Sequence, residues 1–431
     1  MTAARRKHNA LTMPPGSPYA CRRAPVSDRC AFGGGRIIAE SNQAQARLRF
    51  NRSELAGGLG DLGVFIPFLV GLVNRCGLQF GPALFCAGLM NVVTGIAFGI
   101  PMPVQPMKAI AAVAISEELN ESQILAAGIV TGVVILLLAV TGLIDWLNRV
   151  IPKSVVRGLQ LALGLKLLTK GVGMAVGTEA LIGWDSIGLG IICVVLVLVL
   201  YSSARFPAAL VVFAIGLVAL LASEPSLLSQ TRLGMNWRLP DLSAWDDWRT
   251  GILRGAIPQI PLTTLNSVIA VCVLSVDLFP KRPAGPRRTA LSVGLMNLIL
   301  CPLGAMPMCH GSGGLAAQYR FGARTGGSVV MLGIAKMALA VLFGGSLLIW
   351  LQQYPQSVLG TLLLFGGLEL ALVCRDQTTR RDSFVMVGTA GVCIALNMAA
   401  GFVAGWALAG LMFWGVIRVD PSRGSENDDS A

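Results

Sequence analysis

Two short stretches of this chain combine helix-breaking residues with side chains and backbone groups that could hold an anion. The first, from Pro101 to Lys108, reads Pro-Met-Pro-Val-Gln-Pro-Met-Lys, and the second, from Pro307 to Gly314, reads Pro-Met-Cys-His-Gly-Ser-Gly-Gly. Proline lacks an N–H and clashes with the preceding helical turn, and glycine is a poor helix former, so both stretches interrupt apolar segments. We predict extended backbone over residues 101–105.

Each break should be followed by a short helix that starts inside the apolar part of the chain. The first helix is expected to start near Pro106, since proline suits the first helical position, and the second near Gly314. The first turn of a helix presents free N–H groups and about half a unit of positive charge. Unpaired backbone at membrane depth is tolerated only where protein covers it or where it lines a wet cavity. Two helix starts that meet there would attract a small anion.

Lys108 places a cation in the first turn of the first short helix. A cation near the centre of a bilayer costs about 2.5–3.5 kcal/mol on insertion scales, and a helix N-terminus is the unfavourable end for it. An anion bound at this point would offset both costs. The alternatives are that Lys108 extends to the inner surface of the membrane, or that it pairs with Asp61 or Glu54.

Neighbouring residues of the two stretches complete the candidate site. Gln105 offers two donors and one acceptor, and Ser312 offers a hydroxyl, although a structural capping role is an equal alternative for both. His310 has no second ligand nearby for a metal, which favours local hydrogen bonding. Glycines permit close approach of the backbone. The candidate binding residues of these stretches are Pro103, Gln105, Met107, Lys108, His310, Gly311, Ser312, Gly313 and Gly314.

A third polar patch lies in the apolar segment that starts at residue 255. Gln259, Thr263 and Asn266 recur at intervals of four and three residues, so they share one helical face. We predict that this face completes the binding site. The alternative is that these side chains only bond neighbouring helices to one another.

The composition indicates a membrane protein. Hydrophobic residues make up 54% of the 431 residues and charged residues 13%, against about 25% charged in soluble domains, and mean hydropathy is +0.69. The net charge of +12 does not indicate nucleic-acid binding, because Lys and Arg lie mostly in a tail and in short loops. The ten cysteines form no C-x-x-C pair and most lie in apolar segments, so we expect neither a metal site nor a cofactor.

The chain divides into two similar halves. Gly-Leu-Met-Asn at 88–91 recurs at 294–297, and the Pro-Met pairs that open the two stretches keep the same offset of 206 residues. We count fourteen apolar segments, seven in each half, so the halves are inserted with opposite orientations. The segments are 57–74, 80–100, 104–116, 123–144, 154–172, 186–201, 207–222, 255–275, 288–304, 311–320, 328–350, 356–374, 384–399 and 401–418.

We therefore predict an all-α polytopic membrane protein built as a seven-plus-seven inverted repeat with broken third and tenth spans. Interrupted segments at corresponding positions of such repeats are typical of the binding site of a transporter. The predicted parts are a basic, disordered tail (1–49), a first repeat (50–222), an interfacial connector (223–254), a second repeat (255–418) and a polar C-terminal tail (419–431).

Charge in the loops predicts the orientation. The short loops on the side of the basic tail carry most of the Arg and Lys, which predicts a cytoplasmic N-terminus, and we expect the cell membrane. An Arg-rich tail poor in acids leaves an organellar membrane as the alternative. Asp61 and Glu54 are candidates for coupling transport to a second ion, although Asn51-Arg52-Ser53-Glu54 has the form of a capping box, which favours a structural Glu54.

With these residues in view, the chain resembles the molybdate transporter family, distant relatives of the SulP sulfate permeases. The stretches that carry the resemblance run from Glu54 to Gly63, from Pro101 to Ala111 and from Pro307 to Arg324, and the likeness covers residues 50–418. It implies uptake of molybdate. Kinship with SulP and uracil permeases also implies core and gate subdomains, an elevator-like motion and a homodimer. The family is often placed in the major facilitator superfamily, but the broken spans argue against that fold.

Several alternatives remain at this point. Sulfate is close to molybdate in shape and is the second substrate candidate. A nucleobase permease would be expected to carry acidic residues where Gln259 and Ser312 lie, and a membrane enzyme would need clustered His, Asp or Glu within the spans. A channel is disfavoured, because inverted, broken repeats indicate alternating access. The expected partners are the oxyanion, the lipid bilayer and a second copy of the chain, with no nucleic acid.

Overall fold

A computed structural model describes residues 48–178, 180–201, 207–229, 233–417 and 419. All of them belong to one compact unit that spans residues 46–431. The expected N-terminal tail, apart from its last two residues, and nearly all of the expected C-terminal tail lie outside the described residues.

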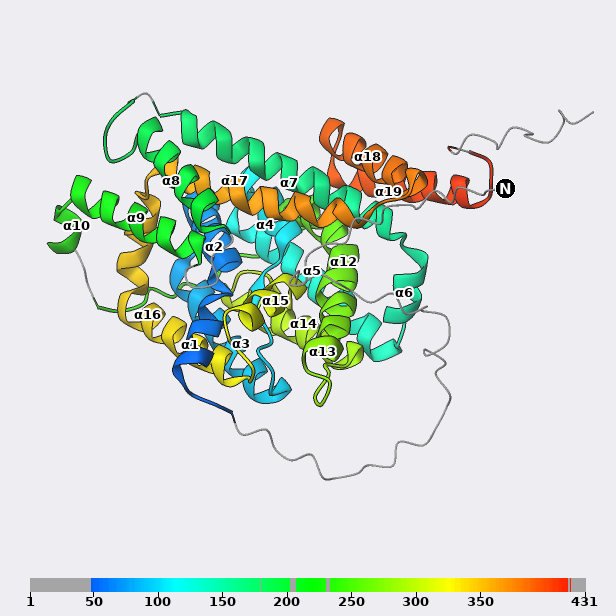
Figure 1. The fold of residues 1–431 in the computed structure, drawn as a ribbon, viewed down its shortest axis with the longest axis horizontal. Helices are drawn as coiled ribbons and strands as arrows, with labels where there is room; N and C mark the ends of the chain where they lie inside the picture. The colour runs from blue at the N-terminus through cyan, green and yellow to red at the C-terminus, as the bar shows by residue number, and fades with distance from the viewer. Residues whose placement is uncertain (1–47, 179, 202–206, 230–232, 418, 420–431) are drawn as a thin grey trace, which may run out of the picture. The chain divides into compact units, whose positions relative to one another are not determined.

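The first half is a succession of helices (Figure 1). It also contains one two-residue strand. Its elements are α1 (Arg52–Leu59), α2 (Leu62–Cys76), α3 (Phe80–Phe98), β1 (Gln105–Pro106), α4 (Lys108–Glu117), α5 (Glu121–Thr141), α6 (Ile144–Val150), α7 (Lys153–Val176), α8 (Ile187–Leu200), α9 (Ala208–Ser223) and α10 (Ser226–Ser229).

The second half contains a second two-residue strand, β2, with a short helix after it. Its elements are α11 (Trp245–Thr250), η1 (Gly251–Ala256), α12 (Ile257–Leu262), η2 (Thr263–Ala270), α13 (Val271–Leu278), α14 (Pro286–Leu300), η3 (Cys301–Leu303), β2 (Met308–Cys309), α15 (Ser312–Arg320), α16 (Gly327–Gln352), α17 (Gln356–Leu372), η4 (Val373–Asp376), α18 (Arg380–Ala395) and α19 (Met398–Phe413).

Six helices among the described residues are long and apolar enough to cross a membrane, or seven if the bent pair α1–α2 is one span. Three shorter apolar helices, α8, α9 and α19, coincide with further predicted segments. The chain is thus mostly helical and multi-pass, and the count of fourteen stays a prediction. One boundary differs from expectation. The span expected from residue 255 is a continuous helix from Trp245 to Leu278, so the end of the expected connector is part of it.

Two helix pairs pack backbone against backbone through facing glycines. Gly88 of α3 faces Gly333 of α16, and Gly95 of α3 faces Gly326, the N-cap residue of α16. A Cβ added to Gly88 or to Gly95 would lie 2.6 Å from the carbonyl oxygen of the glycine opposite. Small residues allow this close approach of helices in lipid, where van der Waals contact replaces the hydrophobic drive. We call α3 and α16 the first clasp.

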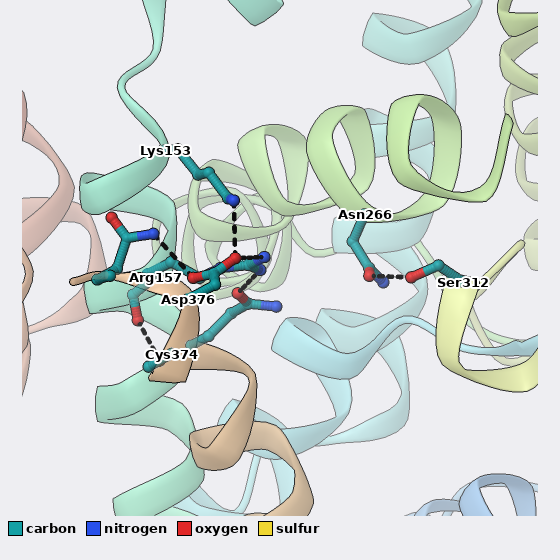
Figure 2. A network of polar contacts seen from close by, with 8 residues as sticks. Lys153, Arg157, Asn266, Ser312, Cys374 and Asp376 are labelled. Atoms are coloured by element: carbon teal, nitrogen blue, oxygen red, sulfur yellow. Dashed lines mark hydrogen bonds and ion pairs between the residues drawn. The ribbon is translucent and has the colours of Figure 1, made fainter. Parts of the chain in front are cut away.

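The second clasp joins α7 and α17, which lie side by side (Figure 1). A Cβ on Gly164 would lie 2.7 Å from the carbonyl oxygen of Gly367, and one on Gly171 would lie 2.6 Å from that of Gly360. At the end of this pair, Asp376 of η4 accepts bonds from Lys153 and Arg157 of α7, at 2.8 and 2.6 Å (Figure 2).

Replacing Gly95 by Ala should destabilise the protein, because the new methyl group would meet the carbonyl of Gly326 and two valine side chains of α16. Overpacking of this kind costs about 1–3 kcal/mol. Thermal unfolding in detergent should therefore show a midpoint several degrees lower. Gly391→Ala is the matched control, because a Cβ at Gly391 of α18 meets nothing within 4 Å. Equal midpoints for both variants would contradict the described packing.

Candidate functional site

The two broken stretches pair with each other. β1 and β2 form an antiparallel ladder in which Gln105 lies opposite Cys309 and Pro106 opposite Met308. The N–H of Met107 extends the pairing by donating to the carbonyl of Pro307 at 2.8 Å. Because the strands are antiparallel, α4 and α15 leave the ladder in opposite directions.

Both short helices start close to the expected positions, but not at them. Pro106 is held in the ladder, so α4 starts only after it, at Lys108. The second helix, α15, starts two residues earlier than expected, at Ser312. Gly311 caps α15, because its carbonyl accepts the N–H groups of Gly314 and Leu315, at 3.0 and 3.3 Å.

Asn297, the last residue of the repeated Gly-Leu-Met-Asn, holds β2 in place. Its side-chain oxygen accepts the N–H of Met308 at 2.8 Å, and its amide donates to the carbonyl of Met308 at 2.7 Å. These bonds satisfy backbone groups at the break that no helix could satisfy. The repeat that was visible in the sequence therefore contains a residue that stabilises the broken stretch.

Lys108 lies half-buried at the wall of a cavity of about 310 Å³. Its ammonium makes no hydrogen bond or ion pair with any described residue, and a Cβ on Gly313 would lie 3.8 Å from it. The pairing with Asp61 or Glu54 that the sequence left open is not present. The cavity also contacts α2, α8, α9 and α17, and its volume falls within the roughly 300–1,000 Å³ of ligand pockets.

The start of α15 supplies free backbone donors beside Lys108. Within the part of the chain that the structure describes, the N–H groups of Ser312 and Gly313 have no acceptor. Gly313 also lines the cavity. An ammonium and the N-terminal N–H groups of a helix are a suitable donor set for an oxyanion.

The start of α4 differs from expectation, because Gln259 fills most of it. The side-chain oxygen of Gln259 accepts the N–H groups of Ala109 and Ile110, at 2.8 and 3.2 Å. We expected both helix starts to offer free N–H groups. In the structure α4 offers mainly the charge of Lys108, and α15 offers the backbone donors.

Gln259 and Asn266 contact the starts of α4 and α15, and from Thr263 to Ala270 the segment is a π-helix, so the spacing predicted for an α-helix does not apply there. The amide of Gln259 donates to the hydroxyl of Thr263 at 2.8 Å. Figure 2 shows the hydroxyl of Ser312 donating to the side-chain oxygen of Asn266, at 2.8 Å. None of the three lines the cavity described above. Their contacts therefore position α4 and α15.

Gln105 occupies the space that the glycines of α15 leave open. A Cβ on Gly314 would lie 2.8 Å from both Gln105 Cδ and Pro103 Cβ, and one on Gly311 would overlap Gln105 Oε1. The amide of Gln105 donates to Asp61 Oδ1 at 2.7 Å. Pro103 and Gln105 therefore leave no room for a side chain at Gly314, whereas a side chain at Gly311 would displace the end of Gln105.

Lys336 is a buried residue of this region that the candidate set lacked. Its ammonium lies 4.0 Å from Asp61 Oδ2, 3.0 Å from Asn91 Oδ1 and 3.5 Å from the ring centroid of Phe65. The available signal was a single lysine within the 26-residue apolar helix α16. A charge inside such a helix is expensive and indicates a functional role with a nearby partner.

His310 and Met107 are buried and act on the local structure. His310 Nδ1 lies 2.8 Å from the carbonyl oxygen of Pro103, so Nδ1 donates and Nε2 accepts from the hydroxyl of Ser292, at 2.9 Å. The ring thereby connects the first break to α14. The side chain of Met107 packs in the apolar core.

Glu54 is fully occupied by backbone groups. Its carboxylate accepts the N–H groups of Arg324 and Thr325 at 3.1–3.2 Å, and its own N–H donates to Asn51 Oδ1 at 2.9 Å. Glu54 therefore holds the loop after α15 against α1. Asp61, in contrast, keeps one buried oxygen without a hydrogen bond.

The far end of α4 carries ion pairs. Glu117 pairs with Lys166 at 2.9 Å and with Arg254 at 3.5 Å. Glu118 pairs with Lys170 at 2.9 Å and with Arg75. These pairs connect α4 to α2, α7 and η1, so both ends of the short helix are anchored.

Two long segments of the chain match the model of one protein family. Residues 53–167 and 251–370 match the model described as "Molybdate transporter of MFS superfamily". The chain is 40% identical to Molybdate transporter 1 of Arabidopsis thaliana, over 83% of this chain and 87% of that one. It is 42% identical to Molybdate transporter 2 of the same plant, over 82% and 84%. The resemblance found in the sequence is confirmed.

Solved structures show the fold. The transmembrane domain of the cyanobacterial bicarbonate transporter BicA matches with a TM-score of 0.60 at 12% identity, over 83% of this chain and 96% of that one. The murine anion transporter Slc26a9, in its inward-facing state, matches with a TM-score of 0.63 at 16% identity, over 85% and 69%. The fold is therefore that of these anion transporters.

Proposed function

We propose that this chain, which belongs to the molybdate transporter family, is a secondary active transporter that takes up molybdate across a membrane. The observation that carries the proposal is the convergence of Lys108 and the free N–H groups of Ser312 and Gly313. Together they supply one full positive charge and two backbone donors, and Lys108 and Gly313 line the same cavity. A tetrahedral dianion fits that chemistry.

The mechanism that we propose is alternating access with an elevator-like movement, within a seven-plus-seven inverted repeat. Its support is the likeness to anion transporters and the position of the site where two broken stretches meet. We further propose a homodimer in the cell membrane with a cytoplasmic N-terminus. Of the two candidate coupling residues, Glu54 is not proposed further, because its carboxylate already accepts the N–H groups of Arg324 and Thr325.

Purified protein in liposomes tests the proposal. We expect uptake of labelled molybdate that is stimulated by unlabelled molybdate on the opposite side, since a carrier shows counterflow and a channel does not. Comparing uptake with and without an imposed pH gradient shows whether transport is coupled to protons. Absence of uptake for every oxyanion in a panel would contradict the proposal.

Sulfate is the second candidate substrate, and competition distinguishes the two. A hundredfold excess of sulfate should reduce the initial rate of molybdate uptake by less than about half, whereas unlabelled molybdate in the same excess should abolish the signal. Equal competition by both anions would mean that the protein transports sulfate, or tetrahedral oxyanions in general.

A further inference from the structure

A buried pair of opposite charges lies directly behind the proposed anion site. Asp61 is 0% exposed and Lys336 is 3% exposed, and their charged atoms are 4.0 Å apart. The pair joins the α1–α2 junction to α16. Neither residue lines the cavity, so the substrate would not touch the pair.

Gln105 connects this pair to the start of α15. Its amide donates to Asp61 Oδ1 at 2.7 Å, and its side chain packs against Gly311 and Gly314 in the cap and first turn of α15. The carboxylate of Asp61 therefore lies one side chain away from the backbone donors that would bind the anion. Asp61 Oδ2 and Gln105 Oε1 are buried without a hydrogen bond.

The position of Asp61 creates a conflict with anion binding. A carboxylate behind the N-terminus of a helix interacts favourably with the same partial positive charge that the substrate needs. It also opposes the charge of Lys108 in a region of low dielectric, where electrostatic effects are large. Without compensation, the Asp61 carboxylate would act as an internal competitor of the substrate.

We propose that Lys336 is a positioning residue that neutralises Asp61, so that Asp61 can orient Gln105 without weakening the site for a dianion. The inference rests on the proposed function. With the pair neutral, the positive charge of Lys108 and about half a unit from the start of α15 stay available to the substrate.

The charged groups around the pair support this assignment. Lys336 is held in place by Asn91 of α3 and by the ring of Phe65 of α2. Lys108 of α4 and Arg320 of α15 are cations that line the cavity, and Glu369 of α17 also lines it, with its carboxylate bonded to Tyr201 at 2.6 Å. Asp61 is thus the carboxylate that Gln105 connects to the start of α15, and Lys336 is its ion-pair partner.

A rescue experiment in proteoliposomes tests the inference. Lys336→Met should raise the KM for molybdate at least about tenfold, because Asp61 is then uncompensated. The double variant Lys336→Met with Asp61→Asn should return the KM to within about threefold of the wild type, because the carboxylate charge is removed as well. Lys336→Arg should stay near the wild type, and Lys153→Met, which removes an exposed lysine remote from the site, is the control.

The outcomes separate charge from packing. Molybdate-induced stabilisation against heat in detergent gives a second readout for variants that insert poorly. A double variant as impaired as the single one, or a single variant with normal KM, would overturn the inference while wild-type uptake upholds the proposed function. If the wild type shows no uptake of molybdate and no stabilisation by it, both the inference and the proposed function are overturned.

Discussion

Replacing Lys108 by Gln should raise the KM for molybdate by about 10- to 150-fold, with little change in the amount of protein in the membrane. Hydrogen bonds to charged groups contribute roughly 1.5–3 kcal/mol, and each 1.4 kcal/mol is a factor of ten. Lys108 has no partner among the described residues, so its replacement breaks no internal contact. The loss should therefore fall on anion binding and not on folding.

Initial rates over a range of molybdate concentrations measure this effect in proteoliposomes. Lys153→Gln is the matched control, because Lys153 is exposed and pairs with Asp376 at the end of the second clasp. Its KM should equal that of the wild type. If the KM of Lys108→Gln equals that of the wild type, Lys108 does not bind the anion. The central element of the proposed function would then be wrong.

Replacing Gln259 by Glu should impair transport while leaving the fold intact. The carboxylate can still accept the N–H groups of Ala109 and Ile110, and a negative charge at a helix N-terminus is favourable. The same charge would oppose anion binding beside Lys108. We expect a KM for molybdate at least about tenfold higher, with a thermal midpoint equal to or above that of the wild type.

Gln259→Leu is the informative counterpart. It removes the acceptor and leaves two buried N–H groups unpaired, at about 1–3 kcal/mol each. The thermal midpoint of Gln259→Leu should therefore fall, whereas that of Gln259→Glu should not. If both variants unfold at the same lower temperature, Gln259 has a different structural role. If Gln259→Glu transports normally, a charge at the start of α4 does not affect anion binding, and this helix start is not part of the binding site.

The sequence was sufficient to locate the two interrupted stretches, because breaks in apolar segments have a local cause. Proline and glycine disrupt a helix wherever they occur, so the two stretches and their short helices could be predicted to within two residues. The start of α4 moved to Lys108 because Pro106 pairs with β2. Such pairing depends on a partner about 200 residues away, which local patterns do not report.

The individual contacts could not be predicted for the same reason. The spacing of Gln259, Thr263 and Asn266 predicts one polar face of an α-helix, but only the fold shows that Gln259 caps α4 and that the segment becomes a π-helix at Thr263. Lys336 and Asp61 are 275 positions apart in the sequence, and their pairing is visible only after α16 has packed against α3. From the sequence, Lys108 is a possible partner of Asp61, and nothing in the local pattern links Lys336 to Asp61.

The two glycine clasps constrain how the molecule can change shape. Within each clasp the backbones touch, so sliding one helix along its mate would drive carbonyl oxygens into neighbouring α-carbons. Between the clasps, the cavity separates α17 from α4 and α15, and its walls are mostly side chains such as Phe365, Leu362 and Pro67. Each clasp is therefore expected to keep its packing as one unit if the helices around the cavity move.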